Sequence, residues 1–88
     1  MSDVVRLRKD KLEWREVEGE VVALDGTASE YLAVNRSGAE LWPLLAEGAT
    51  RVQLAARLSE AFGLDADRAA EDVEAFLAAL DERGLLER

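Results

Sequence analysis

The sequence predicts a single α+β domain in which a three-stranded antiparallel sheet comes first and three helices follow. Its 88 residues suffice for one small hydrophobic core and not for a second. Apolar residues make up 49% and charged residues 34%, which is typical of a folded chain even at a net charge of -8. Near residue 35 the hydrophobic pattern changes from strand-like alternation to helical spacing. We therefore expect residues 1–88 to form one domain.

The first two strands are predicted at residues 12–17 and 20–25. They are separated by Glu18 and Gly19 alone, and a two-residue spacing is typical of a tight hairpin. Gly19 is expected to supply the positive φ that such a turn requires, because it has no Cβ to clash. The two segments should therefore pair as antiparallel neighbours.

A third strand is predicted after a second chain reversal at residues 25–28. As the last member of the meander it should lie at an edge of the sheet. A short extra strand is also expected at residues 4–7. The residues predicted for the third strand are Glu30, Tyr31, Leu32, Ala33 and Val34.

The first helix is expected to begin at a capping box made by Ser37 and Glu40, in which each side chain accepts a hydrogen bond from a backbone N–H of the first turn. It should run to about Glu47, with Gly48 as its stop. Pro43 lies inside this helix and removes one backbone hydrogen bond, so a kink or an irregular turn is expected there.

The second helix begins at another capping box, made by Thr50 and Gln53, and ends at Gly63. Helical spacing predicts an apolar face on it made by Leu54, Leu58, Ala61 and Phe62.

The third and longest helix is expected to start near Asp65 and to end at Arg83 and Gly84, with Leu85 folding back onto Leu80. Helical spacing predicts an apolar face on it made by Ala69, Val73, Phe76, Leu77 and Leu80.

The residue types argue against an enzyme. The chain has no histidine and no cysteine, so it lacks the commonest general base, the commonest zinc ligands and a thiolate nucleophile. Acidic pairs such as Asp65 and Asp67 fall in the first turn of a helix, where the helix dipole favours them. Phe76 stands where a calcium loop starting at Asp65 would need a glutamate. No catalytic, metal or cofactor site is expected.

The charge balance argues against nucleic acid as a partner, because 11 basic residues face 19 acidic ones. No apolar run approaches the roughly 20 residues that span a bilayer, and the N-terminus lacks the hydrophobic region of a signal peptide. We expect a cytoplasmic protein without a membrane partner. A local basic patch, interpreted as a solvated arm, remains at Arg6, Arg8, Lys9, Lys11 and Arg15.

The predicted edge strand at residues 30–34 is the one feature that suggests binding. An unpaired edge offers backbone N–H and C=O groups that an extended peptide can complete. Proline at Leu32 or Val34 is expected to abolish such binding if those N–H groups face outward. The alternative is that Tyr31, Leu32 and Val34 are ordinary strand residues, with Trp14 and Trp42 as core anchors.

The order of these elements resembles the PqqD-like family, also called recognition elements of ribosomally synthesised and post-translationally modified peptides (RiPPs). Residues 30–42, EYLAVNRSGAELW, are similar to that family's strand-to-helix junction. Residues 45–50, 54–62, 72–80 and 84–86 agree with its later segments. The resemblance covers residues 12–88 and rests on the joint order and spacing of short apolar patterns.

The resemblance implies a winged helix-turn-helix-like fold that binds the leader segment of a precursor peptide by strand addition. The leader would lie against the third strand, in a cleft walled by the third helix. On that helix the implied contact residues are Asp72, Val73 and Phe76, with Arg68 and Ala69 nearer the mouth.

Within the family, the chain looks most like the discrete leader-binding subunit of lasso-peptide biosynthesis. Tyr31 in the third strand, the stop at Glu47 and Gly48, and an alanine-rich third helix carry this likeness. The implied partners are the precursor leader and a separate leader peptidase or other RiPP-modifying enzyme. Ala33 and Pro43 depart from the family pattern, so the pyrroloquinoline quinone peptide chaperones remain an alternative.

Two other functions share the predicted fold. A winged-helix transcriptional regulator needs a basic recognition helix, whereas residues 65–83 carry seven acidic residues against Arg68 and Arg83. A dimerisation subunit would pair its edge strand with a second copy of itself.

Overall fold

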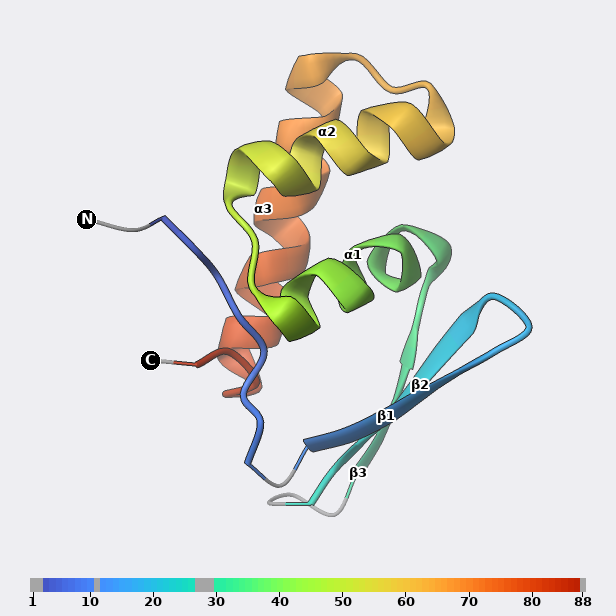
Figure 1. Ribbon diagram of the computed structural model, residues 1–88, viewed down its shortest axis with the longest axis vertical. Coiled ribbons are helices and arrows are strands. Elements are labelled where there is room, and N and C mark those ends of the chain that lie inside the picture. The colour runs from blue at the N-terminus through green and yellow to red at the C-terminus, as the bar shows by residue number, and fades with distance from the viewer. Residues whose placement is uncertain (1–2, 11, 27–29, 88) are drawn as a thin grey trace.

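A computed structural model describes residues 3–10, 12–26 and 30–87, and it confirms three strands followed by three helices (Figure 1). The strands are β1 (Leu12–Val17), β2 (Glu20–Asp25) and β3 (Glu30–Val34). The helices are α1 (Arg36–Glu47), α2 (Arg51–Phe62) and α3 (Ala66–Glu82).

The three strands form one antiparallel sheet in the order β1-β2-β3. Glu18 and Gly19 form the predicted two-residue turn, with φ values of 52° and 81°. Positive φ at both central residues is the geometry whose twist suits a hairpin. Of the second reversal, Asp25 and Gly26 are described, whereas Thr27 and Ala28 lie outside the described residues.

The predicted start of α1 is wrong. Asn35 is the N-cap, and its side-chain oxygen accepts a hydrogen bond of 2.8 Å from the N–H of Gly38. Because β3 ends at Val34, the helix can begin at once after Asn35, and this places Ser37 inside the first turn. Glu40 forms no capping box and instead pairs with Arg57 on α2. The helix continues through Pro43 to Glu47.

The ends of α2 and α3 agree with the sequence signals. Thr50 and Gln53 form the capping box of α2, which ends at Gly63 in the left-handed conformation. Asp65 caps α3 through a hydrogen bond from the N–H of Arg68. Beyond α3, Leu85 folds back and donates its N–H to the carbonyl of Leu80.

One core joins the sheet to the helices. α1 packs on β2, β3 and α2, and α2 packs on α3. The predicted face of α3 is buried except for Phe76, which is half-buried. The predicted face of α2 is only partly correct, because Ala61 and Phe62 lie exposed in its last turn. The largest fully buried side chains are Trp42, Leu41, Leu45, Leu54, Leu58, Leu85, Val21 and Val73.

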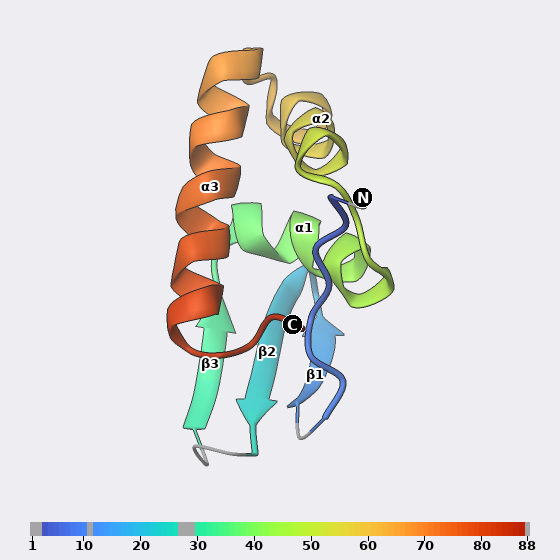
Figure 2. The same cartoon turned by 90° about the vertical axis from the view of Figure 1, so that its left-hand side faces the viewer.

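The N-terminal segment forms no regular strand, contrary to the expectation for residues 4–7. It makes isolated bridges from Val5 to Ala49 and from Leu7 to Leu86, so it crosses the end of α1 and the C-terminal segment (Figure 2). Leu7 is buried in the core. No helix within the described ranges is long and apolar enough to cross a membrane.

Candidate functional site

β3 is an edge strand, as predicted, and within the described residues its pairing partner is β2. α3 rises beside the end of β3 on the same flank of the molecule (Figure 2). We call this flank the edge site and define it by the five residues of β3 together with Arg68, Asp72 and Phe76 of α3. It brings together residues more than thirty positions apart in the sequence.

The register of the sheet determines which backbone groups of β3 face the open edge. Val17 and Glu20 flank the two-residue turn and therefore form a hydrogen-bonded pair. Hydrogen-bonded and non-bonded pairs alternate along an antiparallel ladder, and each residue of a strand directs its N–H and C=O to one side. Counting along β2 to its partners on β3, we infer that Tyr31 and Ala33 direct their N–H and C=O groups to the open edge.

This register corrects the expectation about proline. Leu32 is paired with Ala23, and Val34 with Val21, at positions where the ladder directs backbone groups toward β2. Proline at Leu32 or Val34 would therefore break the sheet itself. The positions that probe the open edge are Tyr31 and Ala33.

The side chains of β3 alternate between the two faces of the sheet. Leu32 and Val34 are half-buried and pack against the core. Tyr31 points to the opposite face and is 76% exposed. Glu30 and Ala33 are also exposed. A peptide strand added beside β3 would alternate in the same way, with every second side chain directed toward α3.

Of the residues predicted on α3, three lie at the surface and two do not. Phe76 and Asp72 are half-buried, and Arg68 is exposed and pairs with Asp72 at 3.4 Å. Ala69 and Val73 are 0% and 1% exposed. They belong to the inward stripe of the helix, so they support the site from behind and offer no surface to a peptide.

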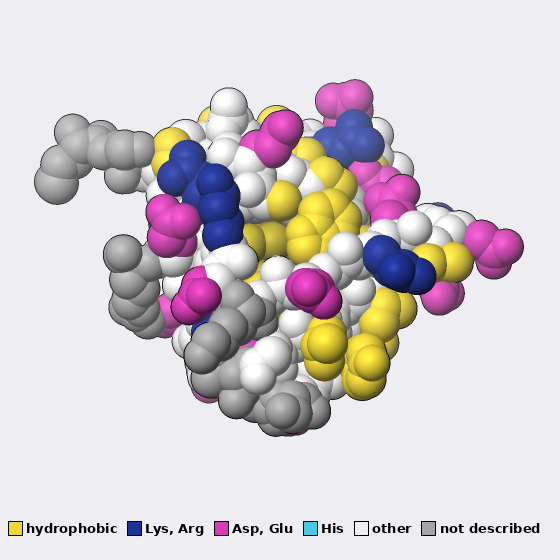
Figure 3. All heavy atoms as spheres, turned by 60° about the horizontal axis from the view of Figure 1, so that its bottom comes forward, with side chains coloured by type: hydrophobic (Ala, Val, Ile, Leu, Met, Phe, Trp, Pro, Cys, Tyr) yellow, Lys and Arg dark blue, Asp and Glu magenta, His cyan; other side chains and the backbone are white. Residues whose placement is uncertain are grey.

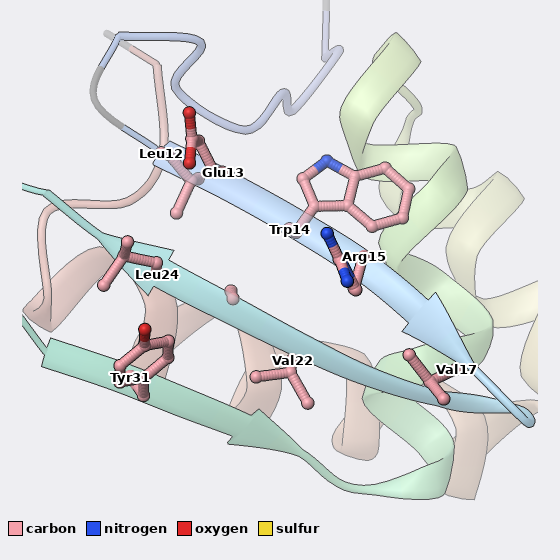
Figure 4. A pocket seen from close by; sticks show the side chains of 9 residues that line it. Leu12, Glu13, Trp14, Arg15, Val17, Val22, Leu24 and Tyr31 are labelled. Atoms are coloured by element: carbon pink, nitrogen blue, oxygen red, sulfur yellow. The ribbon is translucent and has the colours of Figure 1, made fainter.

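A hollow over the sheet was missed by the sequence reasoning (Figure 4). Tyr31 lies at its margin, and Trp14 forms part of its wall. Trp14 also packs edge-on against the buried Trp42, with the ring centroids 6.3 Å apart. Hydrophobic side chains gather on this side of the molecule (Figure 3). The available signal for this hollow was the presence of Val17 on β1 and Val22 on β2, two apolar residues that the structure leaves exposed. The other lining residues are Leu12, Glu13, Arg15, Val17, Val22, Ala23 and Leu24.

The predicted basic patch is divided in the structure. Arg6 donates to the carbonyl of Glu47, and Arg8 pairs with Asp25 at 2.9 Å. Arg15 lies on β1, at the hollow, and Lys9 is exposed. Lys11 lies outside the described residues. Two of the five cations are therefore engaged in holding the N-terminal segment to the domain.

The edge site can bind through main-chain hydrogen bonds and apolar contacts. Among the residues that the structure describes, there is no group of histidine, cysteine, aspartate and glutamate side chains that could hold a metal ion. The open N–H and C=O groups at Tyr31 and Ala33 suit an extended peptide. Leu32, Val34 and Phe76 add an apolar surface next to them.

Comparison with known proteins gives one family and three solved structures. Residues 20–86 match the family described as coenzyme PQQ synthesis protein D (PqqD). No curated protein matches the sequence significantly. TbiB1 in complex with the TbiA(beta) leader peptide is 26% identical, with a TM-score of 0.85 over 93% of this chain and 94% of the other.

The other two structures agree in fold. A lasso peptide synthetase B1 complexed with the leader peptide is 25% identical, with a TM-score of 0.81 over 96% of this chain and 98% of the other. The PqqD truncation of Methylobacterium extorquens PqqCD is described as a functional, stand-alone RiPP recognition element. It is 26% identical, with a TM-score of 0.72 over 99% of this chain and 92% of the other.

Proposed function

The chain belongs to the PqqD family, and on that premise we propose that it binds the leader segment of a ribosomally made precursor peptide. The leader adds as a strand to the open edge of β3, beside α3. The chain then presents the bound precursor to a separate enzyme, a leader peptidase of lasso-peptide biosynthesis. It supplies recognition, and its partner supplies catalysis.

The observation that carries this proposal is the open edge of β3 at Tyr31 and Ala33. An extended peptide gains affinity from main-chain hydrogen bonds at such an edge and selectivity from the side chains beside it. Two of the similar structures are complexes with leader peptides, which supports a peptide as the occupant. The lasso-peptide assignment is supported by the higher TM-score of the lasso synthetase subunit than of the PqqD domain.

Titration with a leader peptide tests the proposal. The probes are synthetic candidate leaders, taken from open reading frames beside this gene and titrated into the purified chain with tryptophan fluorescence and calorimetry as readouts. We expect saturable one-to-one binding in the micromolar range or tighter. If no neighbouring leader binds, the edge site is not a leader-binding site.

Ala33→Pro tests strand addition. Proline removes an N–H that faces the open edge, where edge strands tolerate it, so the domain should fold. Net hydrogen-bond energies near 1 kcal/mol, together with the bulk of the ring, predict a loss of affinity of about ten-fold or more. Ala33→Val is the matched control, because it keeps the N–H and suits a strand. Equal affinity in both variants would exclude pairing at this edge.

Delivery to an enzyme needs its own experiment. A candidate leader peptidase from the same gene neighbourhood is incubated with the precursor whose leader binds, with and without this chain. We expect cleavage to accelerate with the wild-type chain and with Ala33→Val, and not with Ala33→Pro. Tight leader binding without any effect on cleavage would keep the binding function and reject the peptidase as the partner.

A further inference from the structure

Gly38 occupies a position where its backbone conformation does not explain a glycine. It lies in the first turn of α1, and its φ is not in the positive range that favours glycine. Alanine is favoured over glycine inside a helix, because glycine loses more backbone conformational entropy there. A glycine at this position therefore suggests that the space beside its backbone is needed for something else.

Two side chains of the edge site fill that space. A Cβ at Gly38 would lie 2.5 Å from Cγ1 of Val34 and 2.7 Å from Cε1 of Phe76. A third contact, with Cζ of Phe76, would be 2.9 Å. All three distances are too short for carbon atoms, so the absent methyl group allows the end of β3 and the middle of α3 to meet over α1.

Neither side chain can easily yield toward the interior. The χ1 angle of valine is restricted to few rotamers, and the rigid phenyl ring of Phe76 packs against a close-packed core. Phe76 is half-buried, so part of its ring remains accessible from outside the core. A methyl group at residue 38 would therefore push the ring outward, toward the place that a strand added to β3 would occupy.

The side-chain rows of the sheet indicate which part of the peptide lies there. The row that contains Val34 continues across β2 at Val21, and the neighbouring row contains Ala23 and Leu32. These are the rows on the core side of the sheet. A residue of an added strand that joins either row points to the same side, next to Phe76.

We propose that Gly38 is a specificity-determining residue that lets Phe76 and Val34 lie back against α1, which makes room beside β3 for a large apolar side chain of the bound peptide. This inference rests on the proposed binding of a leader at the edge site. Gly38 acts through Phe76 and Val34 and is a positioning residue, because it does not itself reach the peptide.

The test compares wild type and Gly38→Ala against a panel of synthetic leaders. Each leader of the panel carries one residue replaced by alanine, and each is titrated by calorimetry. For the native leader we expect Gly38→Ala to lose about ten-fold or more in affinity. For the leader in which alanine replaces the residue that faces Phe76, the affinities of the two proteins should differ by less than about three-fold. Ser37→Ala, one position away in the same turn, is the matched control and should behave as wild type.

Phe76→Leu gives an independent test, should Gly38→Ala fail to fold. Leucine lacks the outer ring atoms, so the space beside β3 becomes larger. At the leader position that faces residue 76, we expect Phe76→Leu to bind phenylalanine or tryptophan more tightly, relative to the native residue, than wild type does.

The outcomes separate the two proposals. If wild type binds no leader, the proposed function fails and the role of Gly38 falls with it. If wild type binds and Gly38→Ala weakens every leader of the panel by the same factor, Gly38 is merely structural. An unchanged preference in Phe76→Leu would also overturn the specificity role.

Discussion

Asn35 shows how one residue sets the junction between the sheet and the helices. Its side chain accepts from the N–H of Gly38 at 2.8 Å, directly after the last residue of β3. The cap thus fixes the direction in which α1 leaves the edge site. The same hydrogen bond holds the backbone of Gly38, over which Phe76 and Val34 meet.

We expect Asn35→Ala to lower the free energy of unfolding by about 1 kcal/mol, the usual cost of losing an N-cap side chain. For a domain of this size that corresponds to a decrease in Tm of about 4–8 °C. Thermal and urea unfolding followed by circular dichroism measure the change. Ser37→Ala should cost far less, because Asn35 and not Ser37 is the N-cap. A larger effect at Ser37 would restore the capping box that the sequence suggested.

At the scale of elements, the N-terminal segment closes a side of the core that the helices leave open. Leu7 is 3% exposed, and its N–H donates to the carbonyl of Leu45. Arg8 donates to the carbonyl of Gly84 and pairs with Asp25, so it joins the segment to β2 and to the C-terminal turn. This segment precedes the matched family region and is nevertheless part of the core.

We expect Leu7→Ala to destabilise the domain by about 2–4 kcal/mol, because it deletes buried methyl groups and leaves a cavity. Val4→Ala is the control. Val4 is 44% exposed, and its truncation should change stability by less than about 0.5 kcal/mol. Urea denaturation provides both values. Equal stability of Leu7→Ala and wild type would mean that the segment does not pack in solution as it does here.

At the scale of the whole molecule, charge separates a peptide-binding function from a DNA-binding one. The chain carries a net charge of -8. On α3, the helix that a winged-helix regulator would place in a groove, acidic residues are exposed along the surface. Such a surface repels phosphates. The fold therefore resembles that of a winged-helix DNA-binding protein, but α3 lacks the positive charge that binding to phosphates requires.

We expect no binding of duplex DNA even at about 50 mM salt, where phosphate contacts are strongest. Fluorescence anisotropy of a labelled random duplex measures this, and a labelled leader peptide is the positive control. Tight duplex binding that weakens steeply with added salt would support the regulator instead.

Self-pairing of β3 is the remaining competitor at this scale, because a second copy could complete the same edge. We expect the purified chain to be monomeric in light scattering, since the edge is proposed to serve a peptide. We also expect the mass to rise by one leader per chain on saturation. A stable dimer that a leader peptide does not dissociate would contradict the proposed function.

The sequence by itself determined the order and nearly all boundaries of the elements. Its signals act over a few residues: Gly19 for the hairpin, Thr50 with Gln53 for the start of α2, Asp65 for the start of α3, and Gly63 for the end of α2. A cap or a tight turn needs only neighbours in the chain, so it can be recognised there. The start of α1 was the exception: Asn35, which directly follows the last residue of β3, caps the helix in place of the capping box expected at Ser37.

Only the tertiary structure decided how these elements make a site. Whether Tyr31 or Leu32 offers its N–H to a peptide depends on the register with β2, and one residue of slip would exchange them. Whether Ala69 or Phe76 reaches the surface depends on the side of α3 that packs inward. The reason for a glycine at residue 38 depends on Val34 and Phe76, which approach it from different elements. Such contacts join residues distant in the chain, so no local pattern contains them.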